Sequence, residues 1–274
     1  VYWLFRTGTW MPLIPSALGW LFSTIFTSAW LAHREYRQRN ALMSLFARHV
    51  SSPIAAEIWR HRGAILQGGT IAPQRMTATV FFSDLTGFTH ITESLAPDIF
   101  ITWLNEYLDA MTSVINDHGG VVIRFIGDAI MAGFGVPIPR TSDRGVSSDA
   151  IRAAYCALAI QDKLILLNKN WASRGLPTVA MRIGLNTGPL LAGSLGSPER
   201  LEYTIHGDTV NTAARLESYQ KDSLRADYFI APCRILISSA TEQHLSPVFS
   251  RRSCGNIKLK GKDFDMEVFR LLSL

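Results

Sequence analysis

The chain has 274 residues, 47% of them hydrophobic and 18% charged, and this composition excludes a chain that is disordered throughout. Its 27 Lys and Arg against 22 Asp and Glu give a net charge of +5. Much of the excess lies in one short segment, so no nucleic-acid partner is expected. The three cysteines form no C-x-x-C pair and have no metal-ligand spacing to the histidines, which fits a reducing compartment.

A run without charged residues, WMPLIPSALGWLFSTIFTSAWLA, spans residues 10–32. About 20 apolar residues are enough for a helix to cross a bilayer, so the run predicts a transmembrane helix rather than a buried core helix. Residues 1–9 are interpreted as the end of a preceding membrane segment and its loop. Three arginines in HREYRQRN follow the run and only Arg6 precedes it. The positive-inside rule then places the rest of the chain in the cytoplasm, at the inner or plasma membrane.

Helical periodicity continues over residues 33–66, with an interruption at Pro53, within a segment that spans 33–70. We interpret this segment as a juxtamembrane helical linker. Two alternatives stay open for it, a solvated connector and a coiled coil that transmits a signal, because sustained heptads are absent.

Residues 71–274 have the alternation of strands and helices expected of one α+β domain. The first six elements predict a ferredoxin-like βαββαβ unit. Their expected bounds are strand 78–84, helix 97–117, strands 120–126 and 129–134, helix 147–172 and strand 178–188. The elements expected after them are strand 202–207, helix 208–219, strand 228–232, a short helix over 238–245 and a closing hairpin over 256–272.

Two carboxylates fall at the ends of the predicted strands. Asp84 ends the first strand, in VFFSDLTGF, and Asp128 follows Gly127 in the turn between the next two strands. Neighbouring strands would bring both to one rim of the sheet, where they repel each other unless a cation lies between them. Hard oxygen ligands favour Mg²⁺ or Mn²⁺. We therefore predict a metal site at Asp84 and Asp128, with the Leu85 carbonyl as a further ligand.

Four segments carry a resemblance to a known family. FFSDLTGFTHI, RFIGDAIMAGFG, MRIGLNTGPLLAG and YTIHGDTVNTAARLE occur in this order along the chain. They resemble the successive signature blocks of the class III nucleotidyl cyclases, the catalytic domains of membrane-anchored bacterial adenylate and guanylate cyclases.

The resemblance implies a reaction and a cofactor. Two divalent metal ions, Mg²⁺ or Mn²⁺, would be held by Asp84 and Asp128, and the 3′ hydroxyl of a nucleoside triphosphate would attack its own α-phosphorus and expel pyrophosphate. No side chain in the four blocks stands out as a general base.

The resemblance also implies roles for four further residues. Arg182 and Lys260 would bind the triphosphate, and Asn211 and Arg215, four apart on one helix, would orient the ribose and meet the transition-state phosphate. In this family the carboxylates and the Asn/Arg pair of one site come from different catalytic domains. A homodimer with two shared active sites is therefore expected.

The choice of purine depends in this family on the positions of Arg124 and Thr204. Threonine fits the adenine-reading group, whereas arginine departs from its usual lysine and could also donate to guanine. ATP is expected in preference to GTP, which makes a membrane-bound adenylate cyclase the leading prediction. The alternatives are a guanylate cyclase and a nucleotide-binding signalling module without turnover. A diguanylate cyclase would need a GGDEF-like turn where this chain has IGDAI.

Overall fold

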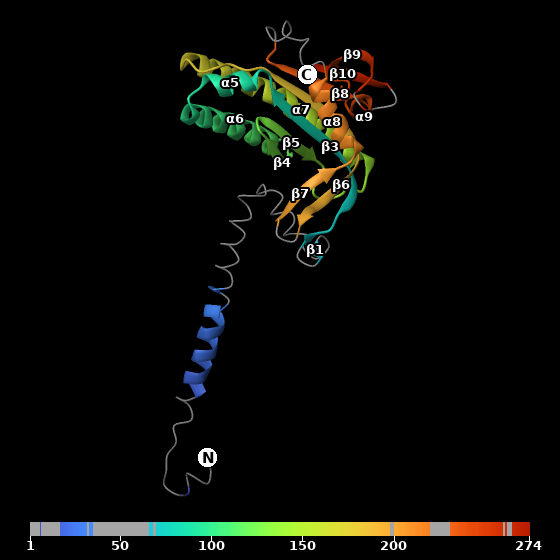
Figure 1. Cartoon of the computed structure of the whole chain (residues 1–274). Helices are drawn as coiled ribbons and strands as arrows, with labels where there is room; N and C mark the ends of the chain where they lie inside the picture. Colours follow the sequence, from blue (N-terminus) through green and yellow to red (C-terminus); the bar gives the residue numbers. More distant parts are fainter. Residues whose placement is uncertain are drawn as a thin grey trace. The chain divides into compact units, whose positions relative to one another are not determined.

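The computed structural model describes residues 6, 17–31, 33–34, 66–67, 70–197, 200–219, 231–259, 261 and 265–274. The chain divides into two units, Val1–His49 and Val50–Leu274. Each unit is described by itself below. Figure 1 shows the elements coloured along the sequence.

The prediction of a transmembrane helix over 10–32 is wrong. The helix in this region is described without interruption over residues 17–31 only. None of the helices in the part of the chain that the structure describes has both the length and the apolar character that a membrane crossing requires. The membrane localisation, the lipid-membrane partner and the cytoplasmic side assigned to the rest of the chain depended on that helix and are withdrawn with it.

The helical linker predicted over 33–70 is also corrected. Of its described residues, 33–34 are helical and the others are extended. Strands β1 (Leu66–Gln67) and β2 (Thr70–Ile71) pair with each other in an antiparallel two-stranded sheet. The segment next to the catalytic domain is therefore a hairpin where a helix was expected, and the remainder of the linker lies outside the described residues.

The second unit is built on one large sheet with the strand order β4-β5-β3-β6-β8-β10-β9, to which β7 adds by pairing with β6. The first four strands in this order have the topology predicted for a ferredoxin-like βαββαβ unit. The strands are β3 (Gln74–Leu85), β4 (Val121–Ile126), β5 (Ala129–Phe134), β6 (Met181–Ser197), β7 (Arg200–His206), β8 (Cys233–Ser238), β9 (Ser250–Ile257) and β10 (Met266–Ser273). The helices are α5 (Phe88–Ser94), α6 (Pro97–Asp117), α7 (Asp143–Ser173), α8 (Asp208–Ser218) and α9 (Ser239–Glu242).

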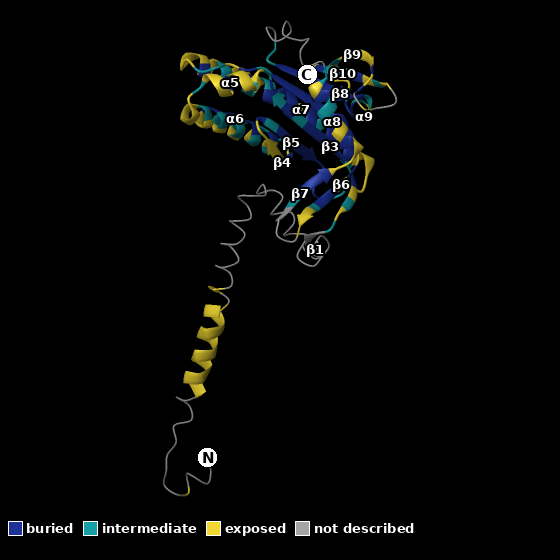
Figure 2. Cartoon of the chain, viewed as in Figure 1, coloured by how far each residue is buried: buried dark blue, intermediate teal, exposed yellow. Residues whose placement is uncertain are grey.

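The two long helices α6 and α7 pack against one face of the sheet, because alternate residues of the strands and one stripe of each helix are apolar. Phe81 and Leu85 of β3 join Trp103 and Tyr107 of α6 and Trp171 of α7 in this core. Figure 2 shows the sheet as the most buried part of the domain. The core therefore holds β3 rigidly up to the residue that follows Asp84.

Helix α8 lies on the opposite face of the sheet. Its residues Val210 and Ala213 pack with Val80 of β3 and Leu190 of β6 in a second apolar cluster. The side chains of Val80 and Leu190 therefore lie on the face of the sheet that α8 covers.

Several predicted elements have other bounds in the structure, and helix α5 was not predicted. Residues 228–230 of the strand expected over 228–232 lie outside the described part of the chain, its residues 231–232 are not in a strand, and β8 follows at Cys233–Ser238. Helix α7 begins at Asp143, where Ser142 accepts a capping hydrogen bond from the Gly145 amide. The strand expected over 178–188 runs from Met181 to Ser197.

Candidate active site

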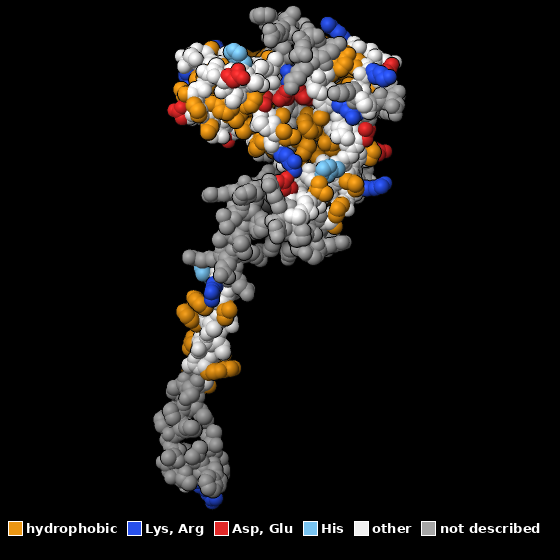
Figure 3. All heavy atoms as spheres, viewed as in Figure 1, with side chains coloured by type: hydrophobic (Ala, Val, Ile, Leu, Met, Phe, Trp, Pro, Cys, Tyr) orange, Lys and Arg blue, Asp and Glu red, His pale blue; other side chains and the backbone are white. Residues whose placement is uncertain are grey.

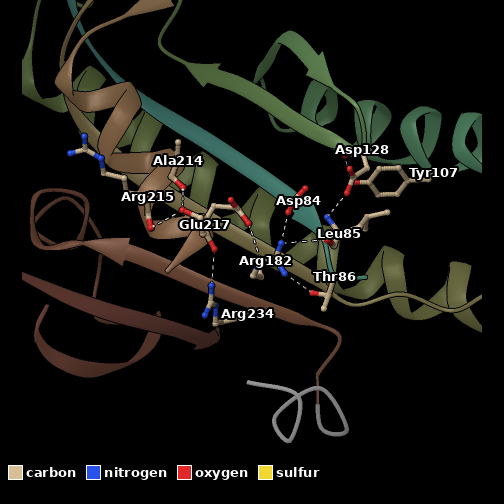
Figure 4. A network of polar contacts seen from close by, with 11 residues as sticks. Asp84, Leu85, Thr86, Tyr107, Asp128, Arg182, Ala214, Arg215, Glu217 and Arg234 are labelled. Atoms are coloured by element: carbon tan, nitrogen blue, oxygen red, sulfur yellow. Dashed lines mark hydrogen bonds and ion pairs between the residues drawn. The ribbon is translucent and has the colours of Figure 1, made fainter. Parts of the chain in front are cut away.

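The carboxylates of Asp84 and Asp128 come from neighbouring strands of the sheet. Asp84 is the penultimate residue of β3, and Asp128 lies in the tight turn between β4 and β5, which Gly127 allows with a φ of 66°. Strand β5 pairs with β3, and the Leu85 amide donates to Asp128 Oδ2 over 2.9 Å. The structure thus brings Asp84, Leu85 and Asp128 together at one rim of the sheet (Figure 4).

The environment of Asp128 opposes its negative charge. Its side chain is buried, with 7% of the residue exposed. Burial, and then the charge of Asp84, raise the pKa of Asp128 to about 6, although the hydrogen bond from the Leu85 amide acts in the other direction. The hydroxyl of Tyr107 of α6 donates to the backbone carbonyl of Asp128 over 3.3 Å. A carboxylate in this position would be stabilised by a cation.

Arg182 lies opposite Asp84 in the β3–β6 pairing. Its guanidinium is almost fully buried, with 1% of the side chain exposed, and it forms an ion pair with Asp84 Oδ2. It also donates to Thr86 Oγ1 over 3.0 Å and to the Leu85 carbonyl over 3.4 Å. The structure therefore places Arg182 against Asp84, the carboxylate predicted to bind metal, whereas its motif predicted a residue that contacts a triphosphate.

Arg182 also connects the rim to helix α8. Its Nε donates to Glu217 Oε1 over 2.8 Å, and the carbonyl of Glu217 accepts from Arg234 of β8 over 2.7 Å. The guanidinium of Arg182 is thus shared between two acids, Asp84 on β3 and Glu217 on α8. Figure 4 shows this chain of contacts running from Asp84 through Arg182 to Glu217.

Asn211 and Arg215 lie on α8 and face away from the sheet. Asn211 is exposed, whereas residues of α8 on either side of it, Val210 and Thr212, are buried. Arg215 is half-buried, and its Nη1 donates to the Gly261 carbonyl over 3.3 Å. In Figure 4 the Arg215 guanidinium points away from Asp84. One chain thus holds both groups of predicted residues without directing them at each other.

The two positions expected to read the purine lie on β4 and β7. Arg124 of β4 is exposed and forms an ion pair with Glu202 of β7. Thr204, two residues after Glu202, is buried and lies opposite Gly193 of β6. Lys260, the second residue expected to bind the triphosphate, lies outside the described residues.

A family model for the adenylate and guanylate cyclase catalytic domain matches residues 71–273. The chain belongs to this cyclase family. The match includes Asp84, Asp128 and helix α8, so the geometry above is that of a cyclase catalytic domain.

Two characterised relatives have adenylate cyclase in their names. Adenylate cyclase 1 of Rhizobium meliloti (strain 1021) is 32% identical over 206 residues, which are 75% of this chain and 29% of that protein. The adenylate cyclase of Anabaena cylindrica is 31% identical over 210 residues, which are 75% of this chain and 38% of that protein. The chain therefore spans about a third of the length of these relatives.

Solved cyclase structures of both purine classes resemble this domain. The adenylyl cyclase CyaB from P. aeruginosa has a TM-score of 0.66 at 32% identity and covers 74% of this chain and 97% of its own. The guanylyl cyclase Cya2 has a TM-score of 0.63 at 30% identity and covers 74% of this chain and 95% of its own. These likenesses confirm the palm-type α+β fold of the cyclases. Because the adenylyl and the guanylyl cyclase match almost equally well, they do not show which purine this domain uses.

Sequence reasoning missed Glu217, Glu202 and Tyr107 as parts of this cyclase site. Tyr107 belongs to the apolar face of α6 and reads as a core residue. Glu202 and Glu217 acquire their partners only through contacts between distant elements, β7 with β4 and α8 with β6. The available sequence signal for Glu217 was its spacing from Val210 and Ala213, which puts an acid on the apolar stripe of the helix.

Proposed function

We propose that residues 71–274 form a catalytic domain that converts a purine nucleoside triphosphate, ATP by preference, to its 3′,5′-cyclic monophosphate and pyrophosphate. The observation that carries this proposal is the pair of carboxylates, Asp84 and Asp128, at one rim of a cyclase-family domain. The 3′ oxygen of the substrate forms the new bond to the α-phosphorus, the bond to the β-phosphate oxygen breaks, and one proton is released.

The rim fits the divalent metal ions of this family. Asp84 and Asp128 would hold them with the Leu85 carbonyl, and the raised pKa of Asp128 is the effect expected of a carboxylate placed for a cation. We propose that the substrate phosphates complete the coordination of the ions held by these two acids. Bound Mg²⁺ or Mn²⁺ would acidify the attacking hydroxyl and neutralise phosphate charge.

Arg182 has two parts in this proposal. In the structure its guanidinium neutralises Asp84. Because it is almost fully buried, it reaches a triphosphate only after exchanging that partner. Lys260 would supply the second basic contact to the phosphates.

We propose that the active sites are shared in a homodimer. Asn211 would orient the ribose and Arg215 would meet the transition-state phosphate of a site whose carboxylates belong to the other subunit. Two observations support this: Arg215 points away from Asp84 (Figure 4), and Phe125 and Ile126 of β4 are 44% and 53% exposed. Figure 3 shows hydrophobic side chains gathered on the face where β3, β4 and β5 lie. Such a face fits a second copy of the chain.

Arg124 and Thr204 would read the purine, with the guanidinium donating to N1 of adenine. The ion pair between Arg124 and Glu202 is the observation that favours GTP as the second candidate. An arginine donor beside a glutamate acceptor could match guanine O6 and its N1–H and N2–H groups.

The test uses the whole chain, purified and supplied with Mn²⁺ and either ATP or GTP. We expect cyclic AMP and pyrophosphate in equal amounts, with a lower rate for GTP. A dimeric, folded protein that cyclises neither nucleotide would refute the proposal and leave a binding module without turnover. A higher kcat/KM for GTP would reverse the purine assignment alone.

Mixing two inactive variants tests the shared site. Asp84→Ala removes a carboxylate and Arg215→Ala removes the transition-state donor, so each homodimer has no intact site. Random exchange of subunits gives half heterodimers, each with one intact site, and we expect about a quarter of the wild-type activity. A mixture that stays inactive although subunits have exchanged would contradict a shared site.

A further inference from the structure

Helix α8 rests on a row of three residues of β6. Gly184, Asn186 and Gly188 are spaced by two, so they lie on one face of the strand, and that face carries α8. Asn186 is the one residue of this row with a side chain, since Gly184 and Gly188 have none.

The two glycines allow the helix to contact the strand backbone directly. A Cβ atom at Gly184 would lie 2.3 Å from the Ala213 carbonyl oxygen, and one at Gly188 would lie 2.8 Å from Thr209 Oγ1. No side chain of β6 therefore interlocks with α8 at these two points. Apolar packing holds the helix down, but it does not by itself fix the position of the helix along the strand.

Asn186 supplies a directional contact at the first turn of α8, whereas the ion pair of Arg182 with Glu217 joins β6 to the last turn. Asn186 is 5% exposed, and its Nδ2 donates to the Thr209 carbonyl in the first turn of α8 over 3.0 Å. Its Oδ1 accepts from Ser238 Oγ over 2.6 Å, which fixes which end of the amide faces the helix. Thr209 is also tied to β6 by its own hydroxyl, which donates to the Pro189 carbonyl over 2.6 Å.

The residues on the outer face of α8 are those assigned to the chemistry. Asn211 follows Thr209 by two residues, and Arg215 lies one turn further. A helix that slides or turns on its seat carries both side chains with it. Displacements of about 1 Å can cost a hundredfold in rate, because transition-state contacts depend steeply on geometry.

We propose that Asn186 is a positioning residue that sets the location of α8 on β6 and, through it, the positions of Asn211 and Arg215. The inference rests on the proposed cyclase function and adds a residue to it. Asn186 contacts neither carboxylate of the rim in the structure, so its loss should affect turnover more than metal binding.

The test compares two variants of the same buried polar network in the whole chain. Asn186→Leu keeps a similar side-chain volume and removes both hydrogen bonds of the side-chain amide. The matched control, Thr187→Val, removes a buried hydroxyl that contacts Thr79 over 2.9 Å and Thr241 over 3.1 Å, neither of which lies on α8.

We expect kcat of Asn186→Leu to fall at least tenfold, with KM for the nucleotide and the dissociation constant for Mn²⁺ within threefold of wild type. Hydrogen exchange of the α8 amides should become faster in this variant. Thr187→Val should lose stability but keep kcat within threefold and leave the α8 amides protected. If both variants lose kcat equally, or if Asn186→Leu keeps wild-type turnover and α8 exchange, the inference is wrong.

Two further results remain informative. If Asn186→Leu does not fold, Asn186→Asp takes its place, since it keeps the side-chain size and the acceptor for Ser238 and replaces only the donor to Thr209. If the wild-type chain forms no cyclic nucleotide, the proposed function fails. Exchange of the α8 amides in the two variants then still decides whether Asn186 positions the helix.

Discussion

Replacing Asp128 with asparagine separates the stability of the domain from the capacity of its rim to bind metal. Asparagine has nearly the same shape as aspartate, and its Oδ1 can still accept the hydrogen bond from the Leu85 amide. It carries no charge, so burial no longer opposes it. We expect Asp128→Asn to be more stable than wild type without metal and to bind Mn²⁺ poorly.

The magnitude follows from the pKa of Asp128, which is 3.8 for an unperturbed side chain and about 6 in the structure. A rise of this size corresponds to about 3 kcal/mol for the ionised form. Because the folded-state pKa is raised, the stability associated with this group is greatest below pH 3.8 and is lost as the pH rises through 6. The advantage of the variant should therefore be about 3 kcal/mol at pH 8 and should vanish towards pH 4.

The assay is urea unfolding of the whole chain between pH 4 and pH 8, with a chelator and then with Mn²⁺. At a hundred times its dissociation constant, Mn²⁺ should stabilise the wild type by about 2.7 kcal/mol and leave the variant unchanged. Asp84→Asn provides a contrast, since it removes the carboxylate that pairs with the buried Arg182 and should destabilise the metal-free protein.

Two results would refute this reasoning. One is an Asp128→Asn variant no more stable than wild type at pH 8 without metal. The other is an advantage that grows as the pH falls. Either would show that burial does not destabilise the ionised Asp128 carboxylate in the metal-free protein.

Four further predictions concern single side chains. Arg124→Ala should lower kcat/KM for ATP about tenfold, the value of one charged hydrogen bond, without changing Mn²⁺ affinity, as initial rates and metal titration would show. Tyr107→Phe should cost about 1 kcal/mol in urea unfolding. Tyr203→Phe should cost nothing, because that buried hydroxyl has no hydrogen-bond partner among the described residues. The hydrogen bond from Arg174 lowers the pKa of Glu106, so this carboxylate stabilises the folded state above pH 4.5 and stops doing so as the pH falls through the lowered pKa. In urea unfolding, Glu106→Gln should therefore be less stable than wild type at neutral pH and equally stable in acid.

The sequence predicted the elements whose signals are local. Helix 97–117 and strand 129–134 have the predicted bounds, because an amphipathic stripe and a tight glycine turn delimit them. Strand β8 at Cys233–Ser238 was not predicted, because a short apolar run does not show where a buried strand begins. The charge-free run 10–32 was predicted to span a membrane from its apolar composition alone, and no helix in the described part of the chain is both long and apolar enough to do so.

The candidate site was predictable as a set of residue types at strand ends. The ends of β3 and β4 bring Asp84 and Asp128 to one rim because β5 pairs with β3. The partners of these residues could not be predicted, because pairs such as Arg182 with Glu217 join elements that the sequence does not align. For the same reason the surface of β6 that contacts α8 could not be predicted. The pattern Gly184-x-Asn186-x-Gly188 gains a meaning only once the helix is seen to pack on it.

The metal-free rim keeps two neighbouring acids stable by two different means, and this difference suggests an order of events in the proposed reaction. Asp84 is neutralised by Arg182, and Asp128 favours its protonated form up to about pH 6. Metal ions held by both carboxylates would require Asp128 to release any proton it holds and would compete with Arg182 for Asp84. The guanidinium of Arg182 would remain tied to Glu217. Arg182 would thus become available to the triphosphate only after the carboxylates have bound metal, which reconciles its burial in the structure with the phosphate-binding part proposed for it.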